Sequence, residues 1–420
     1  MSLAAVAVPP RDYMLGRALK CFGVAVIALV LLVPVWVLVR AGTYDSFVDN
    51  PLSGWGMWGT FIILLATGPR GKEIGATVSL ALAMRLAYDL KIGEKGYGGS
   101  IVISMGVFLG IASLVTMGVQ AMRAESRRVA MVRRALGVIL IFNYLGVCLA
   151  FYVHLAEILR PYKLDYFLYA FDGSLGFEPA FALGKLVHVI RPLHWLVAMV
   201  YNSLGLWFCM IYAIHARAHR KFPFSFLRLI IANALMGFTL YFFFPAMGPK
   251  YAYPSFPNLP SVTSAGPFLQ WGVPNAMPSL HFGGMLLIFW MARPWKWARL
   301  ATGSAVALTA VATLGLGEHY LVDLVVALPY ALAILAFACD VPERRFPLLA
   351  GAVMVFSWLG VLRFGSIHPI IARMLIAVTL IVCLWLERKL ALSIWGSHCE
   401  DHTSAIEDAS SLTCVGPREP

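Results

Sequence analysis

The stretch Asn275-Ala-Met-Pro-Ser-Leu-His-Phe-Gly-Gly284 (NAMPSLHFGG) runs directly into the apolar segment MLLIFW. This junction predicts the start of a membrane helix, with Ser279 placed to cap its N-terminus. His281 lies in the first turn of that helix, where an ionisable side chain is costly to bury without a partner. Ionisable residues inside membrane segments are therefore candidates for function. The stretch predicts a helical membrane protein that uses a histidine at a helix end.

The composition of the whole chain agrees with a membrane protein. The chain has 420 residues, of which 60% are hydrophobic and 13% charged, and its mean hydropathy is +0.78. Soluble domains contain roughly a quarter charged residues, so lipid is the expected solvent. The net charge of +12 comes from short basic clusters between apolar runs, which argues against a nucleic-acid partner. The seven cysteines show no CxxC spacing, so we expect neither a disulfide framework nor a metal site.

The apolar runs predict an all-α, polytopic transmembrane helical bundle of about 10–12 spans. Two of these spans, 55–68 and 75–90, are weak. The convincing ones lie near 21–39, 101–121, 135–158, 193–214, 226–244, 299–317, 320–340, 347–363 and 369–386, with a short one near 278–291. Either count places both termini on the same side of the membrane.

The basic clusters predict the orientation. They occur at 11–20, 70–72, 122–134, 215–221, 292–299, 342–345 and 387–389. Alternation of the spans places every cluster on one side, which the positive-inside rule assigns to the cytoplasm. We therefore expect a multi-pass protein with both termini cytoplasmic. The membrane that we expect is a bacterial inner or plasma membrane. The long outward loops are 160–192, with amphipathic surface helices, and 245–276, ordered but irregular.

A second histidine motif lies at an outward turn, at the same depth as the first. It reads Gly317-Glu-His-Tyr-Leu-Val-Asp323, and its His319 and Asp323 share one helix face at i,i+4 spacing. A carboxylate there can accept a hydrogen bond from one ring nitrogen and leave the other free as a nucleophile. A second histidine, His281, beside an anion-binding helix end completes a set suited to phosphoryl transfer. Taken singly, each histidine is more often a cap or anchor, and Asp323 a solvated helix start.

The paired motifs PSLHFGG and GEHYLVD resemble the type 2 phosphatidic acid phosphatase superfamily. They are most similar to the branch that contains the inositol phosphorylceramide synthases, which are inositolphosphotransferases. The upstream stretches DYFLYAFDGSLGFEP and VYNSLGLWFCM also resemble that branch. The resemblance implies a six-helix catalytic core, in which His319 attacks phosphorus, Asp323 orients it and His281 protonates the leaving alcohol. A lipid donor and a hydroxyl acceptor, or water, are the implied partners, without a cofactor or metal. The expected organisation is 1–134 (N-terminal membrane helices), 135–345 (catalytic membrane domain), 346–390 (transmembrane hairpin) and 391–420 (polar, disordered cytoplasmic tail).

The sequence departs from the phosphatase branch of that superfamily. The branch has Ser-Arg six to seven residues before the nucleophile, where this chain has Ala312 and Thr313, and glycine where it has Leu280. We expect Lys250, on the outward loop, and Ser279, at the helix end, to bind phosphate; a lysine anchored at the lipid boundary is the alternative for Lys250. Other outward-facing cations are Arg160, Lys163, Lys185 and Arg191.

The function that this pattern favours is a lipid phosphotransferase with a phosphohistidine intermediate. One alternative is a lipid or polyprenyl phosphate phosphatase that uses water. An alternative of another class is a non-catalytic transporter or lipid scaffold, which would show internal repeats; none is evident in the sequence.

Overall fold

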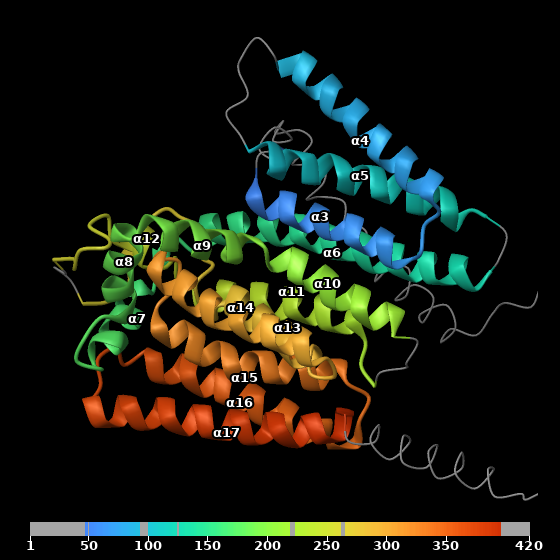
Figure 1. Ribbon diagram of the computed structural model, residues 1–420. Coiled ribbons are helices and arrows are strands. Elements are labelled where there is room, and N and C mark those ends of the chain that lie inside the picture. Colours follow the sequence, from blue (N-terminus) through green and yellow to red (C-terminus); the bar gives the residue numbers. More distant parts are fainter. Residues whose placement is uncertain are drawn as a thin grey trace, which may run out of the picture.

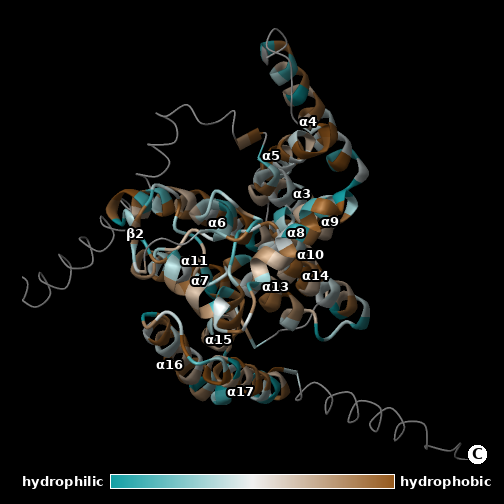
Figure 2. Ribbon diagram, turned by 90° about the vertical axis from the view of Figure 1, so that its left-hand side faces the viewer, coloured by the Kyte–Doolittle hydropathy of each residue, from teal (hydrophilic) through white to brown (hydrophobic). Residues whose placement is uncertain are grey.

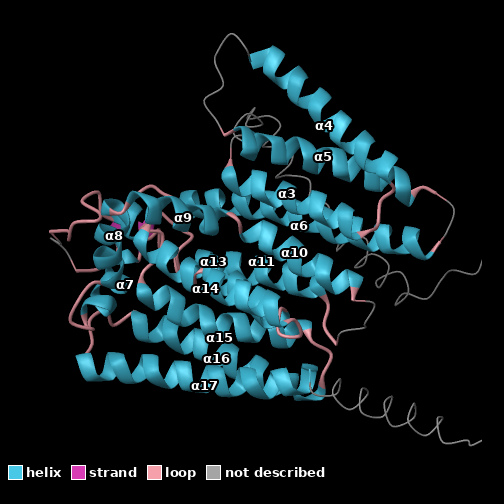
Figure 3. Ribbon diagram, in the orientation of Figure 1, coloured by secondary structure: helices cyan, strands magenta, loops and turns pink. Residues whose placement is uncertain are grey.

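The computed structural model describes residues 47–48, 50–92, 100–123, 126–218, 223–261 and 265–395. The predicted span at 21–39 and the tail from residue 396 lie outside these residues. The described part is an all-α bundle, with loops mainly at its two ends (Figures 1 and 3). Its helices are α3 (Pro51–Ala66), α4 (Gly71–Ile92), α5 (Ile101–Ala121), α6 (Arg127–Leu159), α7 (Asp165–Gly173), α8 (Pro179–Val189), α9 (Arg191–Asn202), α10 (Leu204–Arg217), α11 (Phe226–Phe243), α12 (Pro249–Ala252), α13 (Leu280–Met291), α14 (Lys296–Gly315), α15 (Leu321–Ala338), the 3₁₀ turn η1 (Pro342–Arg344), α16 (Arg345–Leu362) and α17 (Pro369–Trp395).

The helices confirm a polytopic membrane protein. Within the described residues, seven helical segments are long and apolar enough to cross a membrane: α5, α6, α11, α14, α15, η1 with α16, and α17. Helices α8 and α9 are together long and apolar enough for an eighth, but the chain bends by 117° at the break between them, as in a broken span or a re-entrant loop. Three more apolar helices, α3, α10 and α13, have 16, 14 and 12 residues, short of the roughly 20 that a straight span needs. The span predicted over 193–214 is interrupted at Ser203, between α9 and α10.

Helix α15 forms the centre of the bundle. It is apolar on all sides, and 83% of its spanning window is buried by protein, as expected for a helix surrounded by others. It packs against α7, α11, α13, α16 and α17. Figure 1 shows α13 and α14 on one side of it and α16 and α17 on the other, and Figure 2 shows that apolar residues predominate on these helices.

The basic clusters that fall within the described residues gather at one end of the bundle. Arg217 at the end of α10 donates to the backbone oxygens of Leu65 and Ala66 at the end of α3. Glu73 of α4 binds Arg123 and Arg128 at 2.8 and 2.6 Å, and Arg293 of the α13–α14 turn binds Glu387 of α17 at 2.6 Å. These contacts join chain segments far apart in sequence at one surface. Its assignment to the cytoplasm stays a prediction.

The opposite end carries the irregular structure. Helices α7, α8 and α12 and the loop of residues 245–276 gather there (Figure 1). The short strands β1 (Tyr162–Lys163) and β2 (Phe268–Leu269) pair antiparallel, with Tyr162 opposite Leu269, and so tie the two long loops together. Helices α7 and α8 lie within 160–192, where the sequence predicts helices on the membrane surface; their position relative to the membrane stays a prediction.

Candidate active site

His281 lies in the first turn of α13, and the local sequence explains its position. The side chain of Ser279 accepts a hydrogen bond from the Phe282 N–H at 3.3 Å, so this residue caps the helix. The imidazole of His281 stacks on the ring of Tyr201 from α9, with centroids 3.9 Å apart and 15° between the planes. His281 is partly exposed, whereas Ser279 is fully buried. The stacking holds one face of the imidazole against Tyr201.

His319 lies in the turn between α14 and α15. The backbone N–H groups of Glu318 and His319 both donate to the Thr313 oxygen at 3.0 Å, which closes the turn. The His319 Nδ1 lies 2.8 Å from the backbone oxygen of Ala276. A carbonyl oxygen can only accept, so Nδ1 carries the proton and the Nε2 lone pair remains free. Burial lowers the pKa of His319 to about 4, against the opposing charge of Glu318, so the ring is neutral near pH 7.

Asp323 lies beside the same ring nitrogen. Its Oδ2 is 3.5 Å from His319 Nδ1 and accepts the Tyr320 N–H at 2.8 Å. Its Oδ1 is buried and has no hydrogen-bond partner among the described residues. The Asp323 carboxyl group therefore lies beside Nδ1–H, while the shorter contact to that proton comes from Ala276.

Two hydrogen bonds join the histidine motifs directly. One is the bond from His319 to Ala276, and the other runs from the Ser279 N–H to the backbone oxygen of Asp323 at 3.3 Å. Helices α13 and α15, which carry the motifs, also pack together. The sequence prediction that the two motifs meet at one end of the bundle therefore agrees with the structure. The catalytic role of each residue stays a prediction.

Two buried aspartates, which sequence reasoning missed, hold this arrangement from α7. The carboxylate of Asp165 accepts the Met247 N–H at 3.0 and 3.1 Å, the Gly248 N–H at 2.9 Å and the Tyr320 hydroxyl at 3.0 Å. Gly248 has a φ of +92°, and a Cβ there would collide with the Glu318 backbone oxygen. Asp165 thus ties the 245–276 loop to the turn that carries His319.

Asp172, two helical turns after Asp165, caps α15 from outside that helix. Its carboxylate accepts the N–H groups of Leu321 and Val322 at 2.7 and 3.2 Å. Both aspartates are fully buried, and burial raises the pKa of Asp165 to about 7 and that of Asp172 to about 8, with these hydrogen bonds acting in the opposite direction. The available signal was a pair of acids at i,i+7 in an otherwise apolar helix.

Lys250 lies next to the turn that carries His319. Its backbone N–H donates to the Gly317 oxygen at 2.9 Å, and its Nζ lies 3.6 Å from Glu318 Oε1. The lysine side chain is 52% exposed, so its charge is accessible to a ligand at the site. Tyr251 also donates to Glu318, at 3.3 Å. Glu318 shares the lysine charge and would compete with a phosphate for it.

The other candidate cations are less well placed. Lys163 is fully buried and donates from Nζ to the Arg160 oxygen at 2.8 Å, and the Arg160 guanidinium lies over the Phe242 ring. Lys185 and Arg191 are exposed on α8 and α9. Among the described residues, no group of three His, Cys, Asp or Glu side chains is close enough to hold a metal ion.

Comparison with known proteins matches one part of the chain to a family. Residues 166–337 match the family model of the PAP2 superfamily. No curated protein and no solved structure matches the chain. The PAP2 match contains His281, His319 and Asp323 as well as Asp172, and it supports a membrane enzyme that acts on phosphate esters. It does not distinguish the branches of the PAP2 superfamily.

Proposed function

We propose that this protein is a membrane-embedded lipid phosphotransferase of the inositol phosphorylceramide synthase type. It moves a phospho-headgroup from a lipid to a hydroxyl acceptor through a phosphohistidine on His319. The observation that carries the proposal is the hydrogen bond from His319 Nδ1 to Ala276, because it leaves Nε2 unprotonated beside the helix that bears His281.

The proposed reaction has two halves. In the first, Nε2 of His319 attacks the phosphorus, the bond from phosphorus to the leaving lipid oxygen breaks, and His281 gives its proton to that oxygen. In the second, the acceptor hydroxyl attacks phosphorus while His281 takes its proton, and the bond from phosphorus to Nε2 breaks. Lys250 and the N-terminal N–H groups of α13 would stabilise the phosphate charge. Water as acceptor would give a phosphatase instead.

The positions that differ from the phosphatase branch support the transferase. Ala312 and Thr313 stand where that branch has Ser-Arg, and both are fully buried. The Thr313 hydroxyl donates to the Ala310 oxygen at 3.0 Å, and its backbone oxygen closes the turn before His319. These residues support the turn and offer no cation to a phosphate, so the anion must be held by other groups.

The test compares the purified wild-type protein with His319→Ala in detergent, over a panel of phospholipids and lipid phosphates with sugar and inositol acceptors. We expect a new phospho-headgroup lipid that the variant does not form. A protein mass increase after an alkaline quench, where phosphohistidine survives, should also disappear in the variant. His368→Ala changes an exposed histidine at the same end and is the matched control.

Each other outcome has a defined meaning. Release of inorganic phosphate alone, lost in His319→Ala, would assign the phosphatase. Products that form equally in both proteins would remove His319 from the chemistry, and the transporter or scaffold class would then lead.

A further inference from the structure

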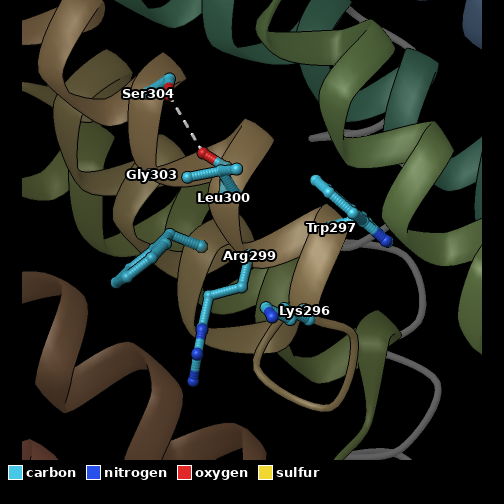
Figure 4. Close-up of a pocket in the computed structure, with 7 residues that line it drawn as sticks. Lys296, Trp297, Arg299, Leu300, Gly303 and Ser304 are labelled. Atoms are coloured by element: carbon cyan, nitrogen blue, oxygen red, sulfur yellow. Dashed lines mark hydrogen bonds between the residues drawn. The ribbon is translucent and has the colours of Figure 1, made fainter.

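A groove of about 520 Å³ opens at the start of α14, away from the histidines. Its lining includes Phe289 from α13 and, from α14, Lys296, Trp297, Arg299, Leu300 and Ser304. Figure 4 shows the two basic side chains at the beginning of α14 and Leu300, Gly303 and Ser304 further along it. The groove therefore joins a charged end to a less polar wall.

The groove and the candidate active site lie at opposite membrane surfaces. Helix α14 begins at Lys296 and has 20 residues, so it is roughly 30 Å long, about the thickness of the hydrocarbon core. His319 follows its other end. A ligand in the groove is therefore not a substrate in contact with the histidines.

Two cations of the groove are unpaired in the part of the chain that the structure describes. Lys296 and Arg299 are exposed and make no ion pair there, whereas the neighbouring Arg293 binds Glu387 at 2.6 Å. Both lie in the first turn of α14, where the helix dipole makes positive charge unfavourable. The N-cap residue, Trp295, makes no side-chain capping hydrogen bond. An anion bound there would offset the unfavourable positive charge and supply the acceptor that the missing side-chain cap does not.

The wall of the groove is suited to acyl chains. Trp297 is 78% exposed and Leu300 62% exposed, on a helix that spans the membrane. Gly303 keeps the wall open beside Phe289, because a Cβ there would lie 3.3 Å from that ring. A tryptophan at the boundary and an aliphatic face beyond it are the arrangement expected beside a phospholipid.

We propose that this groove binds an anionic phospholipid of the leaflet opposite the candidate active site. The Arg299 guanidinium and the Lys296 ammonium bind the phosphodiester oxygens, and the acyl chains lie along Leu300 and Phe289. The charge of the groove complements the lipid, and the sequence assigns this surface to the cytoplasm, whose leaflet is rich in anionic lipids. The site is independent of the proposed transferase chemistry.

Native mass spectrometry of the full-length protein in detergent tests the proposal, with added phosphatidylglycerol or phosphatidylcholine. We expect the wild type to retain phosphatidylglycerol preferentially. The Lys296→Gln/Arg299→Gln variant should lose this preference by about thirtyfold, from two surface cations. Both residues are exposed, so the fold should survive. Arg345→Gln/Arg388→Gln removes two exposed cations at the same surface, outside the groove, and should leave the preference unchanged.

Quenching of Trp297 fluorescence by phosphatidylglycerol with brominated chains gives a second measurement. The comparison of wild type with Trp297→Phe isolates the quenching of Trp297 itself. This quenching of Trp297 should be weaker in the protein that carries Lys296→Gln/Arg299→Gln. Equal retention of both lipids, or equal loss in the control pair, would overturn the proposal, since general surface charge would then explain the binding. Displacement of the lipid by millimolar inorganic phosphate would also overturn it and indicate a simple anion site.

Discussion

The Nδ1–H of His319 faces two acceptors of different kinds. The neutral oxygen of Ala276 lies at 2.8 Å and the carboxylate of Asp323 at 3.5 Å. The hydrogen bond to the Ala276 oxygen is enough to fix the proton on Nδ1, because a carbonyl oxygen can only accept. An ionised Asp323 would stabilise the imidazolium-like state formed as Nε2 bonds to phosphorus.

This division of roles predicts the effect of Asp323→Asn. In a Ser-His-Asp triad the corresponding change costs about 10⁴ in rate, because the tautomer is lost. Here Ala276 keeps the tautomer, so we expect the rate of the His319-dependent reaction to fall only about 10- to 100-fold, mainly in kcat. Steady-state kinetics on the product found in the lipid panel measure it. A loss as complete as in His319→Ala would show that Asp323 alone sets the tautomer.

At the scale of elements, the N-terminus of α15 depends on a carboxylate from another helix. Asp172→Ala would leave the N–H groups of half-buried Leu321 and buried Val322 without that acceptor. We expect the free energy of unfolding to fall by about 2–3 kcal/mol, measured by denaturant unfolding in detergent. Asp172→Asn keeps an acceptor oxygen and should lose less. The control is Asp340→Ala, which removes an exposed carboxylate paired with Arg228 and should change stability much less. If Asp172→Ala were as stable as wild type, the capping role would be contradicted.

The sequence predicted the helices of this site better than it predicted the hydrogen bonds that hold those helices in place. The spans of α5 and α11 are set by continuous apolar runs, and the Ser279 cap by local chemistry, so a short window contains the needed information. The roles of Asp165 and Asp172 depend on backbone N–H groups more than 80 and about 150 residues away, which leave no trace in a local pattern. The break at Ser203 was missed because apolar residues flank the short polar pair Asn202-Ser203 on both sides within the predicted span.

At the scale of the molecule, the two ends of the bundle carry different kinds of residues. The histidine motifs and the long loops occupy one, and the basic clusters with the α14 groove occupy the other. The sequence anticipated this separation, since apolar runs and basic clusters alternate along the chain. The sequence did not indicate how the N-terminal helices pack against the part that matches the PAP2 family model. The small residues that allow such close packing give no hydropathy signal. In the structure, α3 packs against both α5 and α10.

The contact between α3 and α10 predicts that the N-terminal helices stabilise the part of the chain that matches the PAP2 family model. A Cβ on Gly59 of α3 would lie 2.6 Å from the Cβ of Cys209 on α10, too close for the two helices to keep their separation. We expect Gly59→Ala to lower the free energy of unfolding by about 1–3 kcal/mol, the usual cost of overpacking, and to separate the transitions of the two parts. Gly118→Ala in α5 is the matched control, because a Cβ there meets nothing within 4 Å and alanine favours the helix. Thermal unfolding of both variants in the same detergent measures the difference, and equal midpoints would mean that α3 only lies beside α10 without supporting it.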